Sequence, residues 1–243
     1  MTRHLDIASF DSMEGVRVAI TGGTSGLGLA LVRELVRRGA RVAFVARTEA
    51  SVERVARLHP GAFGIVGDVA QKEDIHRIAL QVLGNLGGLD VLVNNASSLG
   101  PTPLALLPDT ECEDLELALA TNVVGPFRLT KTLLGALTAS ARDGRGGVVL
   151  NVSSDAAINA YPQWGAYGAS KAALHHMSRI WGEELAAEGV KVLSLDPGDM
   201  DTPMHAAAVP DADPATLKRP ETAAREIAEA IAVSLPGRLV EAH

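Results

Sequence analysis

The stretch Val16-Arg17-Val18-Ala19-Ile20-Thr21-Gly22-Gly23-Thr24-Ser25-Gly26-Leu27-Gly28 decides the fold of this chain. Residues 16–21 form a short apolar run that predicts a buried strand, and residues 26–38 carry apolar side chains at helical spacing. Between them, glycines at the spacing Gly-x3-Gly-x-Gly let the backbone approach a pyrophosphate, and the helix start offers it unpaired N–H groups. A tight turn that uses the glycines only for positive φ is the alternative. The residues expected to hold the phosphates are Gly22, Thr24, Ser25, Gly26, Leu27 and Gly28.

Strand and helix patterns alternate along the whole chain. Strands are expected near residues 16–21, 41–46, 62–67, 90–94, 147–152 and 190–195. Helices are expected near residues 26–38, 49–58, 71–86, 113–140, 165–188 and 221–234. Such alternation implies a parallel sheet that is covered by helices on both faces. We therefore expect one domain over residues 1–243, with a doubly wound, Rossmann-like α/β/α architecture.

A second motif, Tyr167-Gly168-Ala169-Ser170-Lys171, places a phenol and an ammonium about one helical turn apart. Both side chains then project from the same helix face. A free phenol has a pKa near 10, and a nearby ammonium lowers that pKa because it favours the phenolate. Tyr167 is therefore expected to exchange a proton with an alcohol or carbonyl oxygen. The alternative is a half-buried Tyr and a solvated Lys on an amphipathic helix.

Several other short motifs accompany these two in a consistent order. They are Asp68 and Val69 in Gly67-Asp68-Val69, Asn94 and Ala96 in Asn94-Asn95-Ala96, Asn122 in Thr121-Asn122-Val123, Ser154 thirteen residues before Tyr167, and Pro197, Gly198 and Thr202. Together with the glycine turn, these residues resemble the short-chain dehydrogenase/reductase family over roughly residues 14–204. Ser97 stands where the family usually has Gly.

The resemblance implies an oxidoreductase that moves a hydride between a nicotinamide cofactor and a carbonyl or secondary alcohol. In this family Tyr167 would give or take the proton and Ser154 would hold the reacting oxygen. Lys171 would lower the Tyr167 pKa and hold the nicotinamide ribose, and Asn122 would link Lys171 to a water chain. A cofactor-binding sensor or scaffold without turnover is the alternative, although such proteins usually lose the Ser, Tyr or Lys. The remaining positions implied to contact the cofactor are Asp68, Val69, Asn94, Ala96, Pro197, Gly198 and Thr202.

The end of the second strand bears on which cofactor is used. Enzymes that select NAD place a carboxylate there to bond the ribose hydroxyls. Alignment with the family puts Ala46 at that position, and Arg47 follows it. A guanidinium can pair with the 2′-phosphate of NADP. We therefore expect NADP(H) to be favoured over NAD(H), while Arg47 facing solvent at a strand end is the alternative.

The segment at residues 198–220 has four prolines and a polar run, and in the family this region covers the substrate. Long connections of this kind are usually functional or disordered. Asp196, Asp199 and Asp201 could attract a cationic substrate, but turn and capping roles are favoured. The residues expected to line a mainly apolar substrate pocket are Ser97, Leu99, Ala156, Ile158, Tyr161, Trp164 and Met204.

Composition excludes several functions. A formal charge of −7 argues against nonspecific nucleic-acid binding. The single Cys112 permits no internal disulfide and indicates a reducing compartment. No secretory signal or membrane span is expected from the sequence. We therefore expect a cytoplasmic location. The adjacent His175 and His176 point different ways, and nothing in the sequence asks for a metal.

Assembly is suggested by residues 165–188, which carry more apolar surface than one buried stripe requires. With the helix near residues 113–140, this surface predicts a two-fold homodimer interface. Many family members end in a strand that pairs dimers into tetramers. Here only a short strand at Leu239-Val240 is possible, so a dimer is expected rather than a tetramer.

Overall fold

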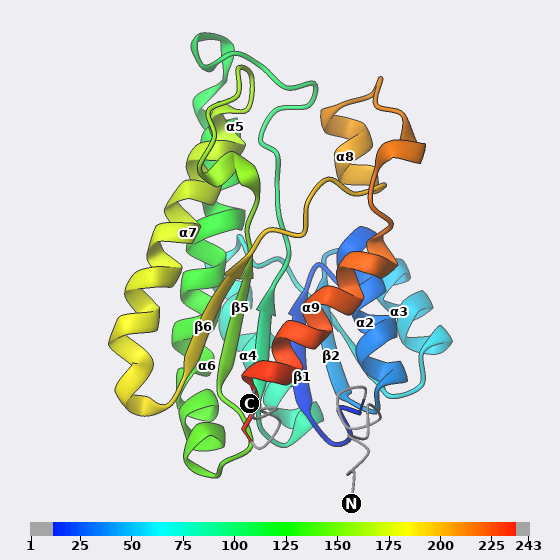
Figure 1. Cartoon of the computed structure of the whole chain (residues 1–243), viewed down its shortest axis with the longest axis vertical. Helices are drawn as coiled ribbons and strands as arrows, with labels where there is room; N and C mark the ends of the chain where they lie inside the picture. Colours follow the sequence, from blue (N-terminus) through cyan, green and yellow to red (C-terminus); the bar gives the residue numbers. More distant parts are fainter. Residues whose placement is uncertain (1–11, 237–243) are drawn as a thin grey trace, which may run out of the picture.

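The computed structural model describes residues 12–236, whose six parallel strands form one sheet in the order β3-β2-β1-β4-β5-β6 (Figure 1). Each strand starts and ends within one residue of a predicted strand. The short apolar runs therefore predicted the sheet correctly. The strands are β1 (Arg17–Thr21), β2 (Arg41–Ala46), β3 (Ala62–Val66), β4 (Val91–Asn94), β5 (Val148–Val152) and β6 (Lys191–Leu195).

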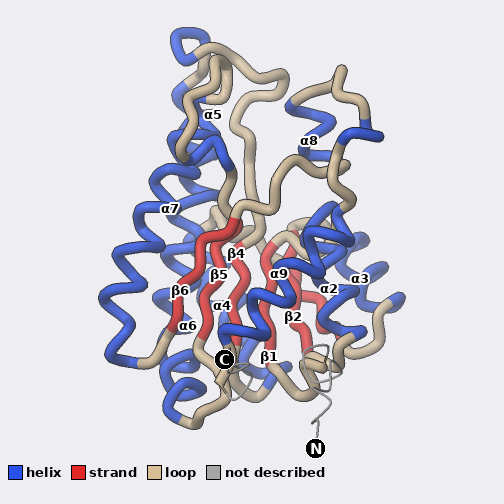
Figure 2. The backbone as a smooth tube through the Cα atoms, in the orientation of Figure 1, coloured by secondary structure: helices blue, strands red, loops and turns tan. Residues whose placement is uncertain are grey.

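Helices cover both faces of this sheet, as Figure 2 shows with strands in red between blue helices. One face packs against α2 (Gly26–Arg37), α3 (Glu49–Leu58) and α9 (Pro220–Ser234). The other face packs against α4 (Lys72–Leu86) and α6 (Gly125–Arg142). Alternate strand residues serve the two cores, because successive side chains of a strand point to opposite faces: Val18 faces the first core and Ala19 the second. The expected doubly wound α/β/α architecture is confirmed.

The strand order places a topological switch beside β1. Strand β1 pairs with β2 on one side and with β4 on the other. In open parallel sheets, ligands bind outside the carboxyl ends of the strands at such a switch point. The glycine turn after β1 and the residues after β4 and β5 therefore meet at one edge of the sheet.

The predicted helix over residues 113–140 is three helical segments. They are α5 (Cys112–Leu119), a π-helical turn (Ala120–Val124) and α6. Pro126 gives a physical reason for the interruption, since it lacks the N–H that an α-helix would direct to the carbonyl of Asn122. The π turn carries Asn122, and such turns are frequent at functional sites.

The other predicted elements need smaller corrections. The helix expected over residues 165–188 is α7 (Gly165–Leu185), followed by a 3₁₀ turn (Ala186–Glu188). Three further 3₁₀ turns lie at Leu107–Asp109, Asp155–Ala157 and Pro214–Thr216. The segment at residues 198–220 contains a short helix, α8 (Pro203–Ala208), that periodicity did not predict. The strand suggested at Leu239-Val240 lies outside the described residues. No helix within residues 12–236 is long and apolar enough to cross a membrane.

Candidate active site

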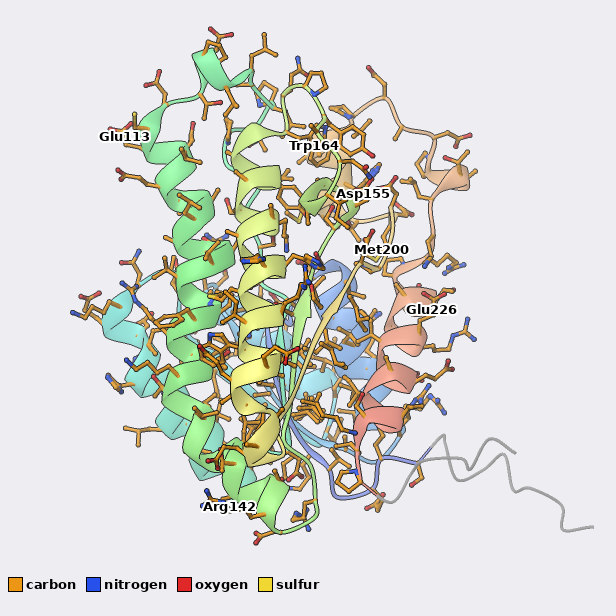
Figure 3. All side chains as sticks on the ribbon, turned by 60° about the vertical axis from the view of Figure 1, so that its left-hand side comes forward. Glu113, Arg142, Asp155, Trp164, Met200 and Glu226 are labelled. Atoms are coloured by element: carbon orange, nitrogen blue, oxygen red, sulfur yellow. The ribbon has the colours of Figure 1, made fainter. Side chains whose placement is uncertain are left out.

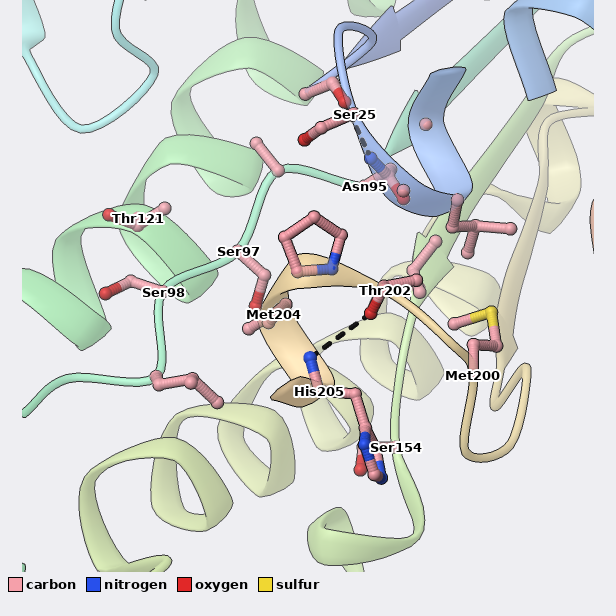
Figure 4. Close-up of a pocket in the computed structure, with 18 of the residues that line it drawn as sticks. Ser25, Asn95, Ser97, Ser98, Thr121, Ser154, Met200, Thr202, Met204 and His205 are labelled. Carbon is pink, nitrogen blue, oxygen red and sulfur yellow. Dashed lines mark hydrogen bonds between the residues drawn. The ribbon is translucent and has the colours of Figure 1, made fainter. Parts of the chain in front are cut away.

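A cleft of about 820 Å³ lies at the carboxyl edge of the sheet. This volume falls in the range of ligand pockets, roughly 300–1,000 Å³. Figure 4 shows Ser25 and Asn95 on one side of it and Met204, His205 and Ser154 on the other. The structure brings sixteen of the predicted site residues to this cleft: Gly22, Thr24, Ser25, Gly26, Leu27, Gly28, Arg47, Asp68, Val69, Ala96, Ser154, Tyr167, Lys171, Pro197, Gly198 and Thr202.

The glycine turn is shaped by close backbone contacts. Gly22 has a φ of +74°, and a Cβ at Gly28 would collide with the carbonyl oxygen of Gly22. Asn95 fixes the turn from β4, because its Nδ2 donates to the carbonyl oxygen of Thr21 at 2.8 Å. The Thr21 hydroxyl in turn accepts from the Ala96 N–H at 3.0 Å. The turn is thus held open at the start of α2, where backbone N–H groups can receive a pyrophosphate.

The adenosine end of the cleft carries two guanidinium groups. Arg47 follows β2, and Arg54 lines the same cleft from α3. Neither forms an ion pair with any acid among residues 12–236, and both are exposed. Asp68 is fixed at the end of β3, since its Oδ1 accepts from the Ala70 N–H at 2.9 Å. A preformed glycine cradle and unpaired cations fit an anionic dinucleotide. Sequence reasoning missed Arg54, because it lies on a helix away from the recognised motifs.

The predicted catalytic residues meet at the other end of the cleft. Ser154 follows β5, and Tyr167 and Lys171 project from the first turns of α7. Lys171 is buried, and its Nζ donates to the carbonyl oxygen of Val152 at 2.8 Å. The same Nζ lies 5.5 Å from the centre of the Tyr167 ring. The spacing prediction for this pair is therefore confirmed in its geometry.

The expected effect of Lys171 on Tyr167 is not what this structure favours. Burial, helped by the charges of nearby aspartates, raises the pKa of Tyr167 to about 12, although a hydrogen bond with Ser154 acts to lower it. Burial also lowers the pKa of Lys171 to about 8, against the opposing charge of Asp196. Desolvation is therefore the largest cause of both pKa shifts.

Asn122 does not line the cleft but supports it from below. Its Nδ2 donates to the carbonyl oxygen of Ser98 and to the hydroxyl of Ser170, both at 2.8 Å. Its Oδ1 accepts from the Ser98 N–H at 2.8 Å. The Ser170 hydroxyl donates to the carbonyl oxygen of Tyr167 at 2.7 Å. Asn122 thus connects the segment after β4 to the helix that carries Tyr167, and it makes no direct contact with Lys171 in the hydrogen bonds of the structure.

Besides Asn122, two further predicted positions fall outside the cleft. Asn94 is buried between strands, where its Nδ2 donates to Asn151 Oδ1 at 2.8 Å and to the Thr130 hydroxyl at 3.3 Å. The resemblance implied that Asn94 contacts the cofactor. In the structure Asn94 instead supports the site from within the sheet. Ile158, expected in the substrate pocket, is 77% exposed and does not line the cleft.

The substrate half of the cleft is apolar with an acidic mouth. Figure 3 shows Asp155 and Trp164 near each other at one end of the molecule, with Met200 below them. The Asp196 carboxylate accepts from the Gly198 N–H at 2.9 Å, which is the turn role expected for it. Three carboxylates line this half, from Asp155, Asp196 and Asp199. The apolar lining comes from Leu99, Leu117, Ala156, Trp164, Met200, Met204 and Val209.

The substrate half also receives α8, from within the segment at residues 198–220. The Thr202 hydroxyl starts this helix by accepting from the His205 N–H at 3.2 Å (Figure 4). Met204, His205 and Ala208 line the cleft from α8. Within residues 12–236, no three His, Cys, Asp or Glu side chains are grouped so that they could hold a metal ion.

Comparison with known proteins agrees with this geometry. The family model for short chain dehydrogenases matches residues 17–213. A 3-oxoacyl-[acyl-carrier-protein] reductase of rhamnolipid biosynthesis from Pseudomonas aeruginosa is 34% identical over 238 residues, covering 93% of this chain and 91% of its own length. An L-fucose dehydrogenase from Mus musculus is 33% identical over 199 residues, covering 82% and 70%.

Solved structures show the same likeness. A short chain dehydrogenase from Shigella flexneri complexed with NADP superposes with a TM-score of 0.84 at 25% identity, covering 91% of this chain and 92% of its own. A 3-ketoacyl-(acyl-carrier-protein) reductase from Brucella melitensis complexed with NADH gives a TM-score of 0.84 at 27% identity, covering 94% and 95%. From its fold, its cleft and these matches, the chain belongs to the short-chain dehydrogenase/reductase family and is an oxidoreductase that acts on a CH–OH or C=O group.

Proposed function

We propose that the protein is an NADP(H)-dependent oxidoreductase that interconverts a small carbonyl compound and its secondary alcohol. The observation that carries this proposal is the meeting of Ser154, Tyr167 and Lys171 in the same cleft as the glycine turn. A purely nucleotide-binding sensor is not favoured, because such a protein has no need to keep all three side chains together, and the relatives are dehydrogenases and reductases.

The nicotinamide supplies or accepts the hydride when it is bound, and the protein supplies position and a proton. Burial keeps the Tyr167 hydroxyl protonated at neutral pH, so Tyr167 is ready to donate a proton to a carbonyl oxygen during reduction. Ser154 orients the same oxygen by a hydrogen bond. In the oxidative direction Tyr167 accepts the alcohol proton, a role that requires added positive charge near its oxygen.

Lys171 and Asn122 support this proton transfer. Lys171 is held on the carbonyl oxygen of Val152, from where we assign it to the nicotinamide ribose. We assign Asn122 to the supply of protons toward Lys171 through its main-chain carbonyl. The support for this is Pro126, which removes the N–H that an α-helix would aim at that carbonyl.

The preference for NADP(H) rests on the adenosine end. Ala46 offers no carboxylate for the ribose hydroxyls, and Arg47 and Arg54 offer two cations to a 2′-phosphate. Related structures hold NADP in one case and NADH in another, so the argument depends on the residues of this chain. The other residues predicted to contact the cofactor also line the cleft, where they would meet it: Asp68, Val69, Ala96, Pro197, Gly198 and Thr202.

A neutral substrate suits the other half of the cleft. Three carboxylates at its mouth would repel an anion, and its walls are mainly apolar. Met204 and Val209 cover it from the segment at residues 198–220, to which we assign the role of substrate cover. Matched pairs of ketones with and without a carboxylate test this directly, because the neutral member of each pair should have the lower KM.

We also propose that the protein forms a homodimer in a reducing, cytoplasmic environment. Phe127 on α6 and Trp181 on α7 pack edge to face at 5.7 Å, Phe127 is 39% exposed, and Ile180 on α7 is 44% exposed. A second copy of this patch would bury these apolar groups by two-fold symmetry. The single Cys112 is exposed and unpaired, which suits a compartment that keeps thiols reduced.

A substrate screen tests the proposed function. Purified protein is incubated with NADPH and a panel of neutral ketones and aldehydes, and loss of the NADPH absorbance band is followed. We expect turnover with several apolar ketones and slower turnover with NADH. Cofactor binding without turnover on any carbonyl or alcohol, in either direction, would favour the sensor.

A further inference from the structure

Asp155 lies between two hydroxyl groups at the mouth of the cleft. Its Oδ1 accepts from Ser154 Oγ at 3.2 Å, and its Oδ2 accepts from the Tyr161 hydroxyl at 2.7 Å. All three residues line the cleft. One carboxylate therefore joins the serine that we assign to the reacting oxygen to an aromatic side chain from the next loop.

The loop that carries Tyr161 is tied to the other side of the site as well. The Tyr161 carbonyl oxygen accepts from the Trp164 N–H at 3.2 Å, and the Trp164 carbonyl oxygen accepts from the Gly168 N–H at 2.7 Å. The Trp164 ring packs edge to face on Tyr167 at 5.7 Å. The bond from Tyr161 to Asp155 thus closes the loop between Ser154 and Tyr167.

The hydrogen bonds of Ser154 show what this closure does. A serine hydroxyl has a single proton and two acceptor positions. Here the proton goes to Asp155, and the oxygen accepts from the Ala156 N–H at 3.2 Å. The hydroxyl is therefore held toward Asp155 in the free protein, and one acceptor position of its oxygen remains open.

Tyr161 controls how strongly Asp155 holds that proton. A carboxylate that already accepts a hydrogen bond from a phenol is oriented by it and is a weaker acceptor for the serine. The Ser154 proton can then turn to the reacting oxygen when a carbonyl compound enters. Without Tyr161, the exposed carboxylate is free to rotate away or to keep the proton.

We propose that Asp155 and Tyr161 form a positioning pair that aims the Ser154 hydroxyl at the reacting oxygen, an inference that rests on the proposed function. Neither residue takes part in proton or hydride transfer. A purely electrostatic role for Asp155 is the competing explanation, because its charge raises the pKa of Tyr167. The charge of Asp199 shifts the pKa of Tyr167 in the same direction, and no hydrogen bond in the described part of the structure joins Asp199 to Ser154, which makes it the control.

The first test compares kcat and KM for the best ketone of the screen. Asp155→Ala should lower kcat/KM about tenfold, mainly through kcat, as expected for the loss of one hydrogen bond to a charged group. Asp155→Asn should keep most of the activity, because its amide oxygen can still accept from Ser154 and its NH₂ can face Tyr161. If Asp155→Asn is as slow as Asp155→Ala, the charge is what matters and the positioning pair is refuted.

The second test is a set of double-mutant cycles. Tyr161→Phe should lower kcat severalfold in the wild type and have no further effect in Asp155→Ala, whereas its effect should be undiminished in Asp199→Ala. In a Ser154→Ala background Tyr161→Phe should also have no effect, since it acts through Ser154. Equal effects of Tyr161→Phe in all backgrounds would show a merely structural or substrate-contacting role. Wild-type turnover by Tyr167→Phe would instead refute the proposed function itself.

Discussion

Lys171 donates from Nζ to the main-chain carbonyl oxygen of Val152 at 2.8 Å, so its ammonium is anchored to the end of β5. The ring of Tyr167 lies next to this ammonium, with 5.5 Å between the Lys171 Nζ and the ring centre. Burial lowers the pKa of Lys171 to about 8. A buried cation that is costly to keep in place is typical of a functional site.

The cost of burying Lys171 predicts a pH-dependent stability. Below pH 8 the Lys171 amine is protonated in both the folded and the unfolded protein, so the folded protein is destabilised by the full cost of burying the ammonium. Between pH 8 and the ordinary value of 10.5, the folded protein has released the proton while the unfolded chain still holds it, so stability rises with pH. Relative to Lys171→Met, the wild type should gain on the order of 3 kcal/mol across this window. Urea unfolding of both proteins at several pH values measures it, and a pH-independent difference would contradict the burial argument.

The aspartates around Tyr167 predict a shift in the pH–rate profile. Burial and the charges of Asp196, Asp155 and Asp199 together raise the pKa of Tyr167 to about 12. Asp199→Asn removes one of these charges and should lower that pKa. The alkaline fall of the reduction rate and the rise of the oxidation rate should both move to lower pH. The exposed Asp211, changed to Asn, serves as the control and should leave the profile in place; an unchanged profile for Asp199→Asn would show that its charge does not reach Tyr167.

The two unpaired guanidinium groups predict the cofactor preference. NADPH should bind more tightly than NADH, and Arg47→Ala should reduce that preference by about tenfold or more, since a hydrogen bond between charged groups contributes roughly 1.5–3 kcal/mol. Arg54→Ala should reduce it severalfold. Arg57→Ala on the same helix is the control, because Arg57 does not line the cleft. Fluorescence titration with both cofactors decides, and equal wild-type affinities would contradict NADP selection.

The exposed apolar patch predicts the oligomeric state. Light scattering at micromolar concentration should give a dimer mass for the wild type, and Ile180→Lys should give a monomer, because a buried unpaired ammonium opposes association. Leu58→Lys, at another exposed apolar position on α3, should remain dimeric. A wild-type monomer or stable tetramer would show that a different surface governs assembly.

Most of the fold could be predicted from the sequence because each strand is a short apolar run bounded by turn residues. The site was predictable to the extent that spacing along one element fixes geometry, as it does for Tyr167 and Lys171 on α7. The π turn at Asn122 was missed because helical periodicity continues through it, and only Pro126 marks it. Asp155 and Arg54 were missed because their roles depend on contacts between elements, which no local pattern records.

The surroundings of each side chain, which set its pKa and its hydrogen bonds, were harder to predict than its place in a motif. The spacing of Tyr167 and Lys171 suggested an ammonium that lowers the phenol pKa, but the burial of both groups reverses the net shift. Asn94 was placed against the cofactor by motif, yet the pairing of β4 with β5 turns its amide toward Asn151. In both cases the motif was identified correctly, and the packing around it decided its chemistry.

The kinetics of Tyr167→Phe test the central claim most directly. This change removes only the proton-donating hydroxyl and keeps the ring against Trp164. We predict that NADPH affinity stays within about twofold while kcat for ketone reduction falls by two or more orders of magnitude, as expected when a general acid is lost. Turnover within a few-fold of the wild type, measured at saturating NADPH, would contradict the assignment of Tyr167 as the proton donor.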